Sequence, residues 1–304
     1  MLTHADKPWT NVYGLARSML ALATLLTLLA DSGERLFHPL VVDDPGIFDR
    51  SAVVGASLFF LARHHLLAAK VLAIVVLLLV IVGWRPRITA LPHWWVSYSF
   101  AASASMVDGG DLVASTLTLL LLPVALTDTR RWHWTGTGSA GVAASIAGQT
   151  GWVLIRVQIA VVYLFAAVLK FPSEEWSNGT ALYYWWRNPS FGAPGFLRPL
   201  TEWLGRTVLV VPVTWSVLLL ELALAAAFVA PLRFRARLLP VAILFHVGIA
   251  LVHGMPTFAL IMSGALVLYL RPAWRPFALP VLRRRVAPRA SEELAPSAPS
   301  ALAR

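Results

Sequence analysis

The sequence predicts an all-α fold, a polytopic transmembrane helix bundle of about eight spans. Hydrophobic residues make up 58% of the 304-residue chain and charged residues 13%, whereas soluble domains are about 45–50% apolar and about 25% charged. Apolar runs of bilayer-spanning length recur along the chain, and the loops between them alternate in arginine content. This composition excludes an ordinary soluble enzyme and a disordered regulator.

The predicted spans are apolar runs separated by polar turns. They cover residues 12–30, 66–84, 91–107, 112–127, 152–170, 208–230, 238–252 and 257–270. The first run contains Arg17 and is too long for the apolar region of a signal peptide, so we expect a membrane anchor. Residues 52–62 cover about half a span, which leaves an interfacial or re-entrant segment and a ninth helix as alternatives.

Loop charges predict the orientation. Arginines follow the second, fourth, sixth and last spans, whereas the turns at 108–111 and 253–256 contain no Lys or Arg. Because Lys and Arg favour the cytoplasmic side, we expect both termini in the cytoplasm and residues 171–207 outside. The abundance of Arg and Ala indicates a GC-rich bacterial genome, and therefore the inner membrane of a bacterial cell.

Residues 1–275 are predicted to form one transmembrane domain, followed by a basic, disordered cytoplasmic tail over residues 276–304, which is rich in Pro, Ser and Ala. The net charge of +10 follows from the loops and this tail, so nucleic-acid binding is not expected. The chain has no cysteine, no P-loop, no GxGxxG and no HExxH, and the adjacent His64 and His65 cannot share a helical face. We therefore predict no metal site.

Ionisable residues inside spans are the main functional clue, because a charge at the bilayer centre costs about 2.5–3.5 kcal/mol on insertion scales. Arg156, Tyr163 and Lys170 follow one another at about two helical turns and share one face of the fifth span. Lys170 is expected at the outer boundary, where a desolvated amine is a base or nucleophile. The alternative is a snorkelling lysine paired with Glu174 or Glu175.

Structural roles account for three further groups of ionisable residues, one of which also suggests proton transfer. Arg17 and Arg156 lie near predicted cytoplasmic ends, where arginine side chains snorkel to the surface. Glu221 and His246 lie near the middle of the sixth and seventh spans, where they pair with each other or move a proton. Two glycines separate Asp108 from Asp111, as in a tight turn with solvated carboxylates.

Several motifs together resemble the SdpB family, the sporulation-delaying protein B group of antimicrobial-peptide systems, over about residues 8–275. They are Arg17 in an apolar helix, Gly83-Trp84-Arg85-Pro86, Asp108-Gly109-Gly110-Asp111, residues 122–128 with Arg131-Trp132-His133-Trp134, and residues 158–170 followed by Glu175-Trp176-Ser177-Asn178-Gly179-Thr180-Ala181. The resemblance implies a membrane factor that acts with a small sister protein to turn a secreted peptide precursor into an active toxin.

SdpB-like proteins belong to the HTTM group, whose membrane domain resembles that of vitamin K-dependent gamma-carboxylase. In that enzyme a similar helix carries the lysine that deprotonates the reduced quinone, and Lys170 corresponds to it, with Tyr163, Trp176 and Gly179 as anchors. The carboxylase also uses a histidine beside its lysine. Here no histidine lies between His93 and His133.

The first functional hypothesis is therefore a membrane factor for maturation or export of an antimicrobial peptide. The second is a carboxylase-related membrane enzyme that uses Lys170 as a base on a quinone or lipid-linked substrate, and it leaves the cofactor open. A transporter is less favoured, because the sequence shows no inverted repeat. The catalytic candidates are Lys170, Tyr163, Glu221 and His246, and the candidates for substrate or partner binding are Trp176, Asn178, Gly179, Asp108, Asp111 and Arg156.

The segment after Lys170 is rich in aromatic residues. Its aromatics either cradle an apolar peptide segment or lie on the membrane as an interfacial helix. They are Trp176, Tyr183, Tyr184, Trp185, Trp186 and Phe191.

Overall fold

The computed structural model describes residues 7–41, 52–138 and 140–278, and the regular elements within these ranges are helices. The longer helices are α1 (Asn11–Ala30), α7 (Leu66–Ile81), α8 (Pro86–Ser103), α9 (Gly109–Leu120), α11 (Val142–Val168), α15 (Val210–Ala226), α16 (Leu232–His253) and α17 (Pro256–Leu270). The shorter ones are α2 (Gly33–Leu36), α3 (His38–Val41), α5 (Ala52–Gly55), α6 (Leu58–Leu61), η2 (Arg63–His65), α10 (Leu122–Leu126), α12 (Glu174–Ser177), α13 (Ala181–Trp185) and α14 (Arg198–Gly205). The predicted all-α class is confirmed, whereas the tail after residue 278 lies outside the described residues.

Each predicted span coincides with helical structure, but several bounds differ. α11 begins at Val142, well before the expected start, and ends at Val168, so Lys170 lies just beyond its last turn. The span at 112–127 is interrupted at Leu121, where α9 ends and α10 begins with a proline in its first turn.

Four helical stretches in the described part of the chain are long and apolar enough to cross a membrane: Asn11–Ala30, Arg63–Ile81, Val142–Val168 and Leu232–His253. A fifth is added if α14 and α15, which meet at 99°, count as one bent span. These helices make the chain a multi-pass membrane protein. A count of about eight spans stays a prediction.

Residues 52–62 do not form a continuous helix, so the alternative of a ninth span is wrong. α5 and α6 are separated at Ala56 and Ser57, and the Ser57 hydroxyl caps α6 by accepting a hydrogen bond from the Phe60 amide at 3.1 Å. Ser57 also bonds Ser103 of α8 at 2.5 Å, which fixes the break against the bundle. The polar serine satisfies the backbone at the interruption.

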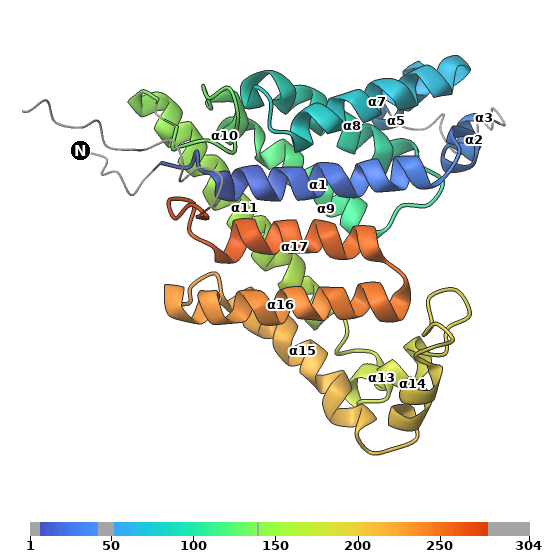
Figure 1. Cartoon of the computed structure of the whole chain (residues 1–304). Helices are drawn as coiled ribbons and strands as arrows, with labels where there is room; N and C mark the ends of the chain where they lie inside the picture. Colours follow the sequence, from blue (N-terminus) through green and yellow to red (C-terminus); the bar gives the residue numbers. More distant parts are fainter. Residues whose placement is uncertain (1–6, 42–51, 139, 279–304) are drawn as a thin grey trace, which may run out of the picture.

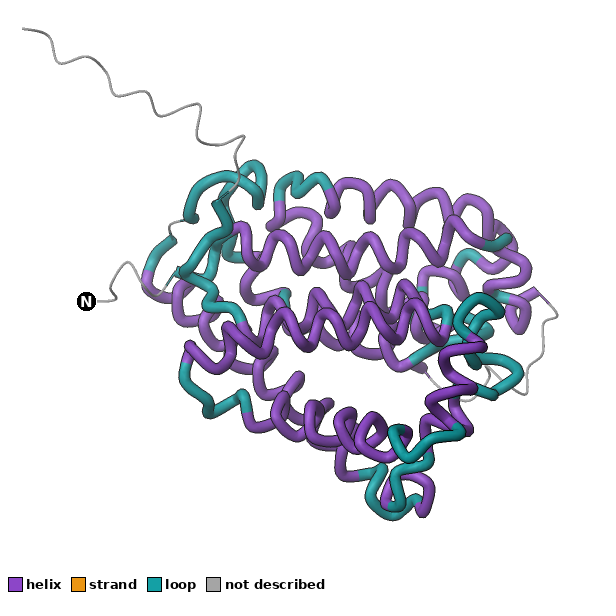
Figure 2. Tube along the Cα trace, turned by 60° about the horizontal axis from the view of Figure 1, so that its bottom comes forward, coloured by secondary structure: helices purple, strands orange, loops and turns teal. Residues whose placement is uncertain are grey.

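α17 lies at the centre of the bundle, between α1 and α16 (Figure 1). Every residue from Ile261 to Leu270 is buried. α17 approaches α1 closely because Gly264 has no side chain, since an added Cβ there would lie 3.3 Å from the Ala16 carbonyl oxygen. α7 and α8 pack beyond α1, and α11 crosses behind α17 to reach α15 (Figures 1 and 2).

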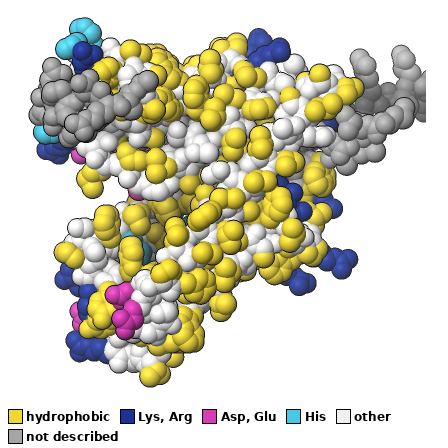
Figure 3. Space-filling view, turned by 180° about the vertical axis from the view of Figure 1, so that it is seen from behind, with side chains coloured by type: hydrophobic (Ala, Val, Ile, Leu, Met, Phe, Trp, Pro, Cys, Tyr) yellow, Lys and Arg dark blue, Asp and Glu magenta, His cyan; other side chains and the backbone are white. Residues whose placement is uncertain are grey.

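The turns at 108–111 and 253–256, which contain no Lys or Arg, lie at the end of the bundle opposite the arginine-bearing loops at 82–87 and 127–137, and the segment at 171–207, which lies at the same end as these turns, carries Arg187, Arg198 and Arg206. At one end, Thr10 donates to the Ala273 carbonyl at 2.5 Å and Asn11 to the Phe277 carbonyl at 2.9 Å, which joins both termini of the described domain. At the other end, His253 bonds the Phe191 carbonyl at 2.7 Å. Figure 3 shows apolar side chains over much of the surface between the two ends. The side of the membrane that each end faces stays a prediction.

Candidate functional site

An ion pair joins Lys170, just past α11, to Glu221 of α15. Lys170 Nζ donates to Glu221 Oε1 at 2.5 Å, and the two side chains are 23% and 8% exposed. The ammonium also lies 5.0 Å from the centre of the Trp176 ring, a cation–π distance. The predicted pairing of Lys170 with Glu174 or Glu175 is therefore wrong, because α15 packs along α11 and supplies a closer, buried carboxylate.

A second polar pair joins α11 to α16, about two helical turns before Lys170. The Tyr163 hydroxyl of α11 bonds His246 Nε2 of α16 at 2.9 Å, and each side chain is 2% exposed. The predicted pairing of Glu221 with His246 is wrong, because α11 supplies a different partner to each of them. Together Lys170, Glu221, Tyr163 and His246 form what we call the Lys170 cluster.

Two polar atoms of the Lys170 cluster have no hydrogen-bond partner among the described residues. They are Glu221 Oε2 and His246 Nδ1, and both are buried. A buried polar atom without a partner costs about 1–3 kcal/mol, and such costs are typical of sites that bind or react. The ammonium of Lys170 and the carboxylate of Glu221 can therefore share a proton. Glu221 Oε2 and His246 Nδ1 can each form one further hydrogen bond.

Arg156 lies on the same face of α11 but near the middle of the helix, about four helical turns before Lys170. Its guanidinium donates to the Phe228 carbonyl at 2.9 Å and lies 5.4 Å from the centre of the Phe228 ring. Arg156 thus ties α11 to the connection between α15 and α16, and the structure does not bring it to Lys170.

The chain turns after Lys170, and this turn packs against α15. Gly179 has φ +84°, and an added Cβ would lie 2.7 Å from Val211 Cγ1 of α15. Only glycine combines this backbone conformation with so close an approach. Asn178 Oδ1 accepts the Thr180 amide at 3.0 Å and so supports the turn. Asn178 and Gly179 therefore shape the segment rather than enter the Lys170 cluster.

Two acidic residues, Glu174 and Glu175, begin the short helix that follows Lys170. The Ser173 hydroxyl donates to Glu175 Oε2 at 2.6 Å, and this hydrogen bond holds the pKa of the exposed Glu175 carboxyl below its usual range. The residues from Glu174 onwards form α12, whose Ser177 carbonyl accepts the Trp215 indole at 3.3 Å. The acidic turn thus faces outward while its backbone is anchored on α15.

The aromatic segment at 171–207 folds as the short helices α12, α13 and α14 rather than as one interfacial helix. Leu182, Trp186, Ala193 and Val210 form its buried core. Its exposed aromatics are Phe171, Tyr184, Trp185, Phe191, Phe196 and Trp203. Both interpretations of these aromatics, a peptide cradle and a membrane-lying surface, stay predictions.

Asp108 and Asp111 form a capping box at the start of α9. Asp108 Oδ1 accepts the amides of Gly110 at 2.7 Å and Asp111 at 3.0 Å, and Asp111 Oδ2 accepts the Asp108 amide at 3.1 Å. Asp111 is buried, not solvated as expected from a turn. Phe258 packs against Gly110 and lies 5.8 Å from the His246 ring, so the hairpin reaches the Lys170 cluster through one aromatic ring.

The structure also shows a buried polar centre that the sequence did not predict. Arg17 of α1 is 1% exposed and donates to Thr89 Oγ1 of α8 at 2.9 Å, so the expectation that Arg17 snorkels is wrong. His93 and His133 lie within electrostatic range of Arg17. The spacing of Thr89 and His93, one helical turn apart, is the signal that could have revealed this polar face.

His133 belongs to the loop between α10 and α11 and is held in a socket made by glycines. An added Cβ on Gly83, whose φ is +83°, would lie 2.4 Å from His133 Cδ2, and one on Gly14 would lie 2.9 Å from the same atom. Burial lowers the pKa of His133 well below its usual range. The motif Arg131-Trp132-His133-Trp134 therefore places His133 in the packed interior of the bundle.

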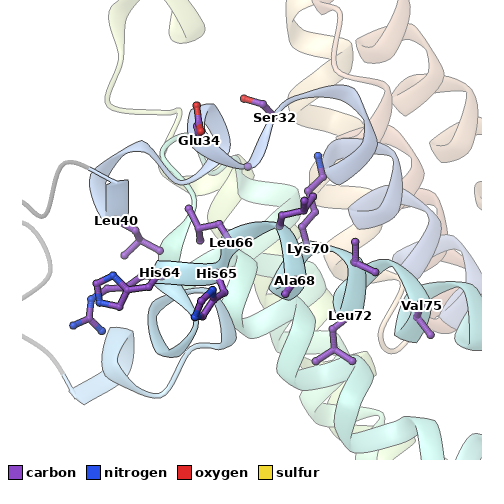
Figure 4. Close-up of a pocket in the computed structure, with 14 residues that line it drawn as sticks. Ser32, Glu34, Leu40, His64, His65, Leu66, Ala68, Lys70, Leu72 and Val75 are labelled. Carbon is purple, nitrogen blue, oxygen red and sulfur yellow. The ribbon is translucent and has the colours of Figure 1, made fainter.

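A pocket of about 1470 Å³ lies among α2, η2 and α7. Figure 4 shows His64, His65 and Lys70 around it together with leucines of α7. Lys70 donates to the Asp31 carbonyl at 2.6 Å, in keeping with a surface lysine near a helix end. The pocket shares no residue with the Lys170 cluster.

Similarity to known proteins identifies the family of this chain. Residues 137–274 match the HTTM domain. The chain is 39% identical over 273 residues to the uncharacterized protein YitO of Bacillus subtilis, covering 87% of this chain and 86% of that protein. It is 36% identical over 269 residues to the sporulation-delaying protein SdpB of the same organism, covering 87% of this chain and 82% of that protein. The chain belongs to the SdpB family.

No solved structure matches this SdpB-family protein. The HTTM match contains α11, α15, α16 and α17, and therefore the whole Lys170 cluster. Arg17, Thr89 and His93 lie outside it, on α1 and α8. The two polar centres thus belong to different parts of the family's sequence.

Proposed function

We propose that this SdpB-family protein is an integral membrane factor for the maturation or export of a secreted antimicrobial peptide. The peptide precursor meets the segment at 171–207, and a small sister protein is the expected partner. Similarity to the sporulation-delaying protein SdpB over most of both chains supports this role.

The observation that carries the proposal is the position of the ion pair between Lys170 and Glu221. The pair lies where the chain leaves α11 for the aromatic segment, directly beside Trp176. An amine that is one quarter exposed is accessible from this segment while its carboxylate partner stays buried. Exposed rings at Tyr184 and Trp185 add apolar surface for a peptide chain.

Deletion of the gene, followed by complementation, tests the proposal. We expect the deletion strain to secrete precursor without killing activity, and the wild-type gene to restore killing. Lys170→Ala should insert into the membrane normally and fail to restore killing, whereas the matched control Lys70→Ala should restore it. Mass spectrometry of the secreted peptide measures maturation directly, and normal killing by the deletion strain would contradict the proposal.

A second candidate is a membrane enzyme that uses Lys170 as a base on a quinone or lipid-linked substrate. Two features favour it: Lys170 is bonded to a carboxylate that can take up a proton, and Glu221 Oε2 has no other partner in the described part of the chain. In this candidate the bonded pair of Tyr163 and His246 extends the proton route into the bundle.

Lys170→Arg separates the two candidates. Arginine keeps the positive charge and the pairing with Glu221, but its guanidinium does not give up a proton in proteins. If Lys170 only positions the segment, Lys170→Arg should retain killing. If Lys170 is a base, Lys170→Arg should behave like Lys170→Ala.

We also propose that both termini face the cytoplasm of a bacterial cell. Since the natural chain has no cysteine, single cysteines can be labelled without background. Ser190→Cys in the aromatic segment should react with an impermeant maleimide in intact cells. Thr135→Cys, in the loop between α10 and α11, should react only after permeabilisation, and the reverse pattern would invert the orientation.

A further inference from the structure

Two arginines meet at the connection between α15 and α16 without a carboxylate to pair with them. The Arg156 guanidinium of α11 donates to the Phe228 carbonyl at 2.9 Å, and Arg235, in the first turn of α16, lies within electrostatic range of Arg156. The ion pairs formed by the described residues include neither arginine, and Nε of each is buried without a partner there. We call Arg156 and Arg235 the arginine pair.

The arginine pair lies where the helices reach one end of the bundle. α15 ends at Ala226 and α16 begins at Leu232, so the chain reverses direction beside the pair. The last turn of α17 lies at the same level, because the Tyr269 hydroxyl donates to the Leu224 carbonyl at 2.7 Å. Basic pockets between membrane helices at such a boundary bind the headgroups of anionic lipids.

An apolar groove begins beside the arginine pair. It has a volume of about 500 Å³ and lies between residues 157–164 of α11 and residues 222–229 of α15 and its connection. Phe228 lines the groove, and its ring centre lies 5.4 Å from the Arg156 guanidinium, so the cationic and the apolar parts adjoin.

The groove suits a hydrocarbon chain. Every residue that lines it is apolar, and its volume lies within the range of about 300–1,000 Å³ that ligand pockets cover. Ala160, Ala225 and Ala226 line it from both helices, and these short side chains leave the space open. Val157 and Val161 are 39% and 38% exposed, so the groove opens on the outer surface of the bundle, where lipid chains lie.

We propose that the arginine pair and the groove together bind one anionic phospholipid. Its phosphodiester pairs with the two guanidinium groups, and one acyl chain lies between α11 and α15. The lipid balances two positive charges that no described carboxylate balances, and it covers an apolar surface next to them. The site lies about four helical turns from Lys170, and this inference does not depend on the proposed function.

Native mass spectrometry of the purified full-length protein in detergent tests the site. Phosphatidylglycerol is compared with phosphatidylcholine of identical acyl chains, so that the contribution of the chains cancels. We expect one phosphatidylglycerol per chain to bind about 5- to 30-fold more tightly, since each arginine near the membrane surface strengthens attraction to an anionic lipid. Inorganic phosphate has no acyl chain and should not displace the lipid.

Variants locate the lipid. Arg235→Gln should weaken phosphatidylglycerol binding about fivefold, whereas Arg237→Gln, which removes an exposed charge from the same helix, should bind like the natural protein. Ala226→Leu fills the groove and should weaken binding of both lipids, and Ala236→Leu, on the exposed surface of α16, is its matched control. Equal affinity for the two lipids, equal losses in Arg235→Gln and Arg237→Gln, displacement by inorganic phosphate, or unchanged binding in Ala226→Leu would overturn the proposal.

Discussion

Removing Lys170 and removing Glu221 should lower the stability of the protein by different amounts. Breaking a buried ion pair by removing one partner costs about 3–5 kcal/mol, whereas an exposed pair is worth about 0–1 kcal/mol. Lys170→Met leaves the carboxylate of Glu221, which is 8% exposed, without its cation, so we expect a loss of about 3 kcal/mol. Glu221→Gln leaves an ammonium that is 23% exposed and can turn toward the membrane surface, so we expect about 1 kcal/mol.

The assay is thermal unfolding in detergent, arranged as a double-mutant cycle. For a chain of this size 1 kcal/mol corresponds to about 2–4 °C, so Lys170→Met should lower Tm by about 6–12 °C and Glu221→Gln by about 2–4 °C. The double variant Lys170→Met with Glu221→Gln removes both charges and should lose less than the sum of the single variants, with a coupling of about 1–3 kcal/mol.

An exposed pair in the same protein provides the control. Arg206 and Glu202 lie 4.0 Å apart on α14, with side chains 75% and 50% exposed. Arg206→Met should therefore change Tm by less than about 2 °C. Equal losses for Lys170→Met and Glu221→Gln, or simple additivity in the double variant, would refute the reasoning that the two groups form one buried pair.

Three further predictions concern the backbone and pH. Gly179→Ala should cost about 1–3 kcal/mol and make the segment at 171–207 more sensitive to protease, because its φ is +84° and Val211 blocks a Cβ, while Gly195→Ala, which meets open space, should be neutral. Since burial lowers the pKa of His133, the unfolded chain takes up the proton first; stability should be full above about pH 6.5 and fall below it, and His133→Asn should show a flatter Tm profile in acid. Asp108→Ala should cost about 1 kcal/mol in a Tm measurement, and Asp108→Ser should restore most of it.

The sequence predicted which face of α11 carries the Lys170 cluster, but not its partners. Helical periodicity places Tyr163 and Lys170 on one face because it depends only on local geometry. The partner of each depends on how α11 packs between α15 and α16, which no local pattern encodes. For the same reason Glu221 and His246 were expected to pair with each other, whereas His246 bonds Tyr163 of α11 and Glu221 bonds Lys170 just past its end.

The prediction that Arg17 snorkels was wrong for a different reason. Its distance from the predicted span end suggested a snorkelling side chain, but the residues before α1 are themselves packed: Trp9 is fully buried and its indole donates to the Val124 carbonyl at 2.9 Å. The start of α8 at Pro86 was also missed, although proline favours the first helical position. With α8 starting there, Thr89 and His93 become helical neighbours that face Arg17.

α17 separates the two polar centres and gives each its own environment. The Lys170 cluster lies among α11, α15 and α16, whereas Arg17 lies between α1 and α8. The buried stretch of α17 from Ile261 to Leu270 is almost entirely apolar and carries no charged side chain. Since sites without shared partners contribute independently to stability, changes in Tm caused by substitutions in the two centres should add, whereas changes caused by substitutions at Lys170 and Glu221 should not.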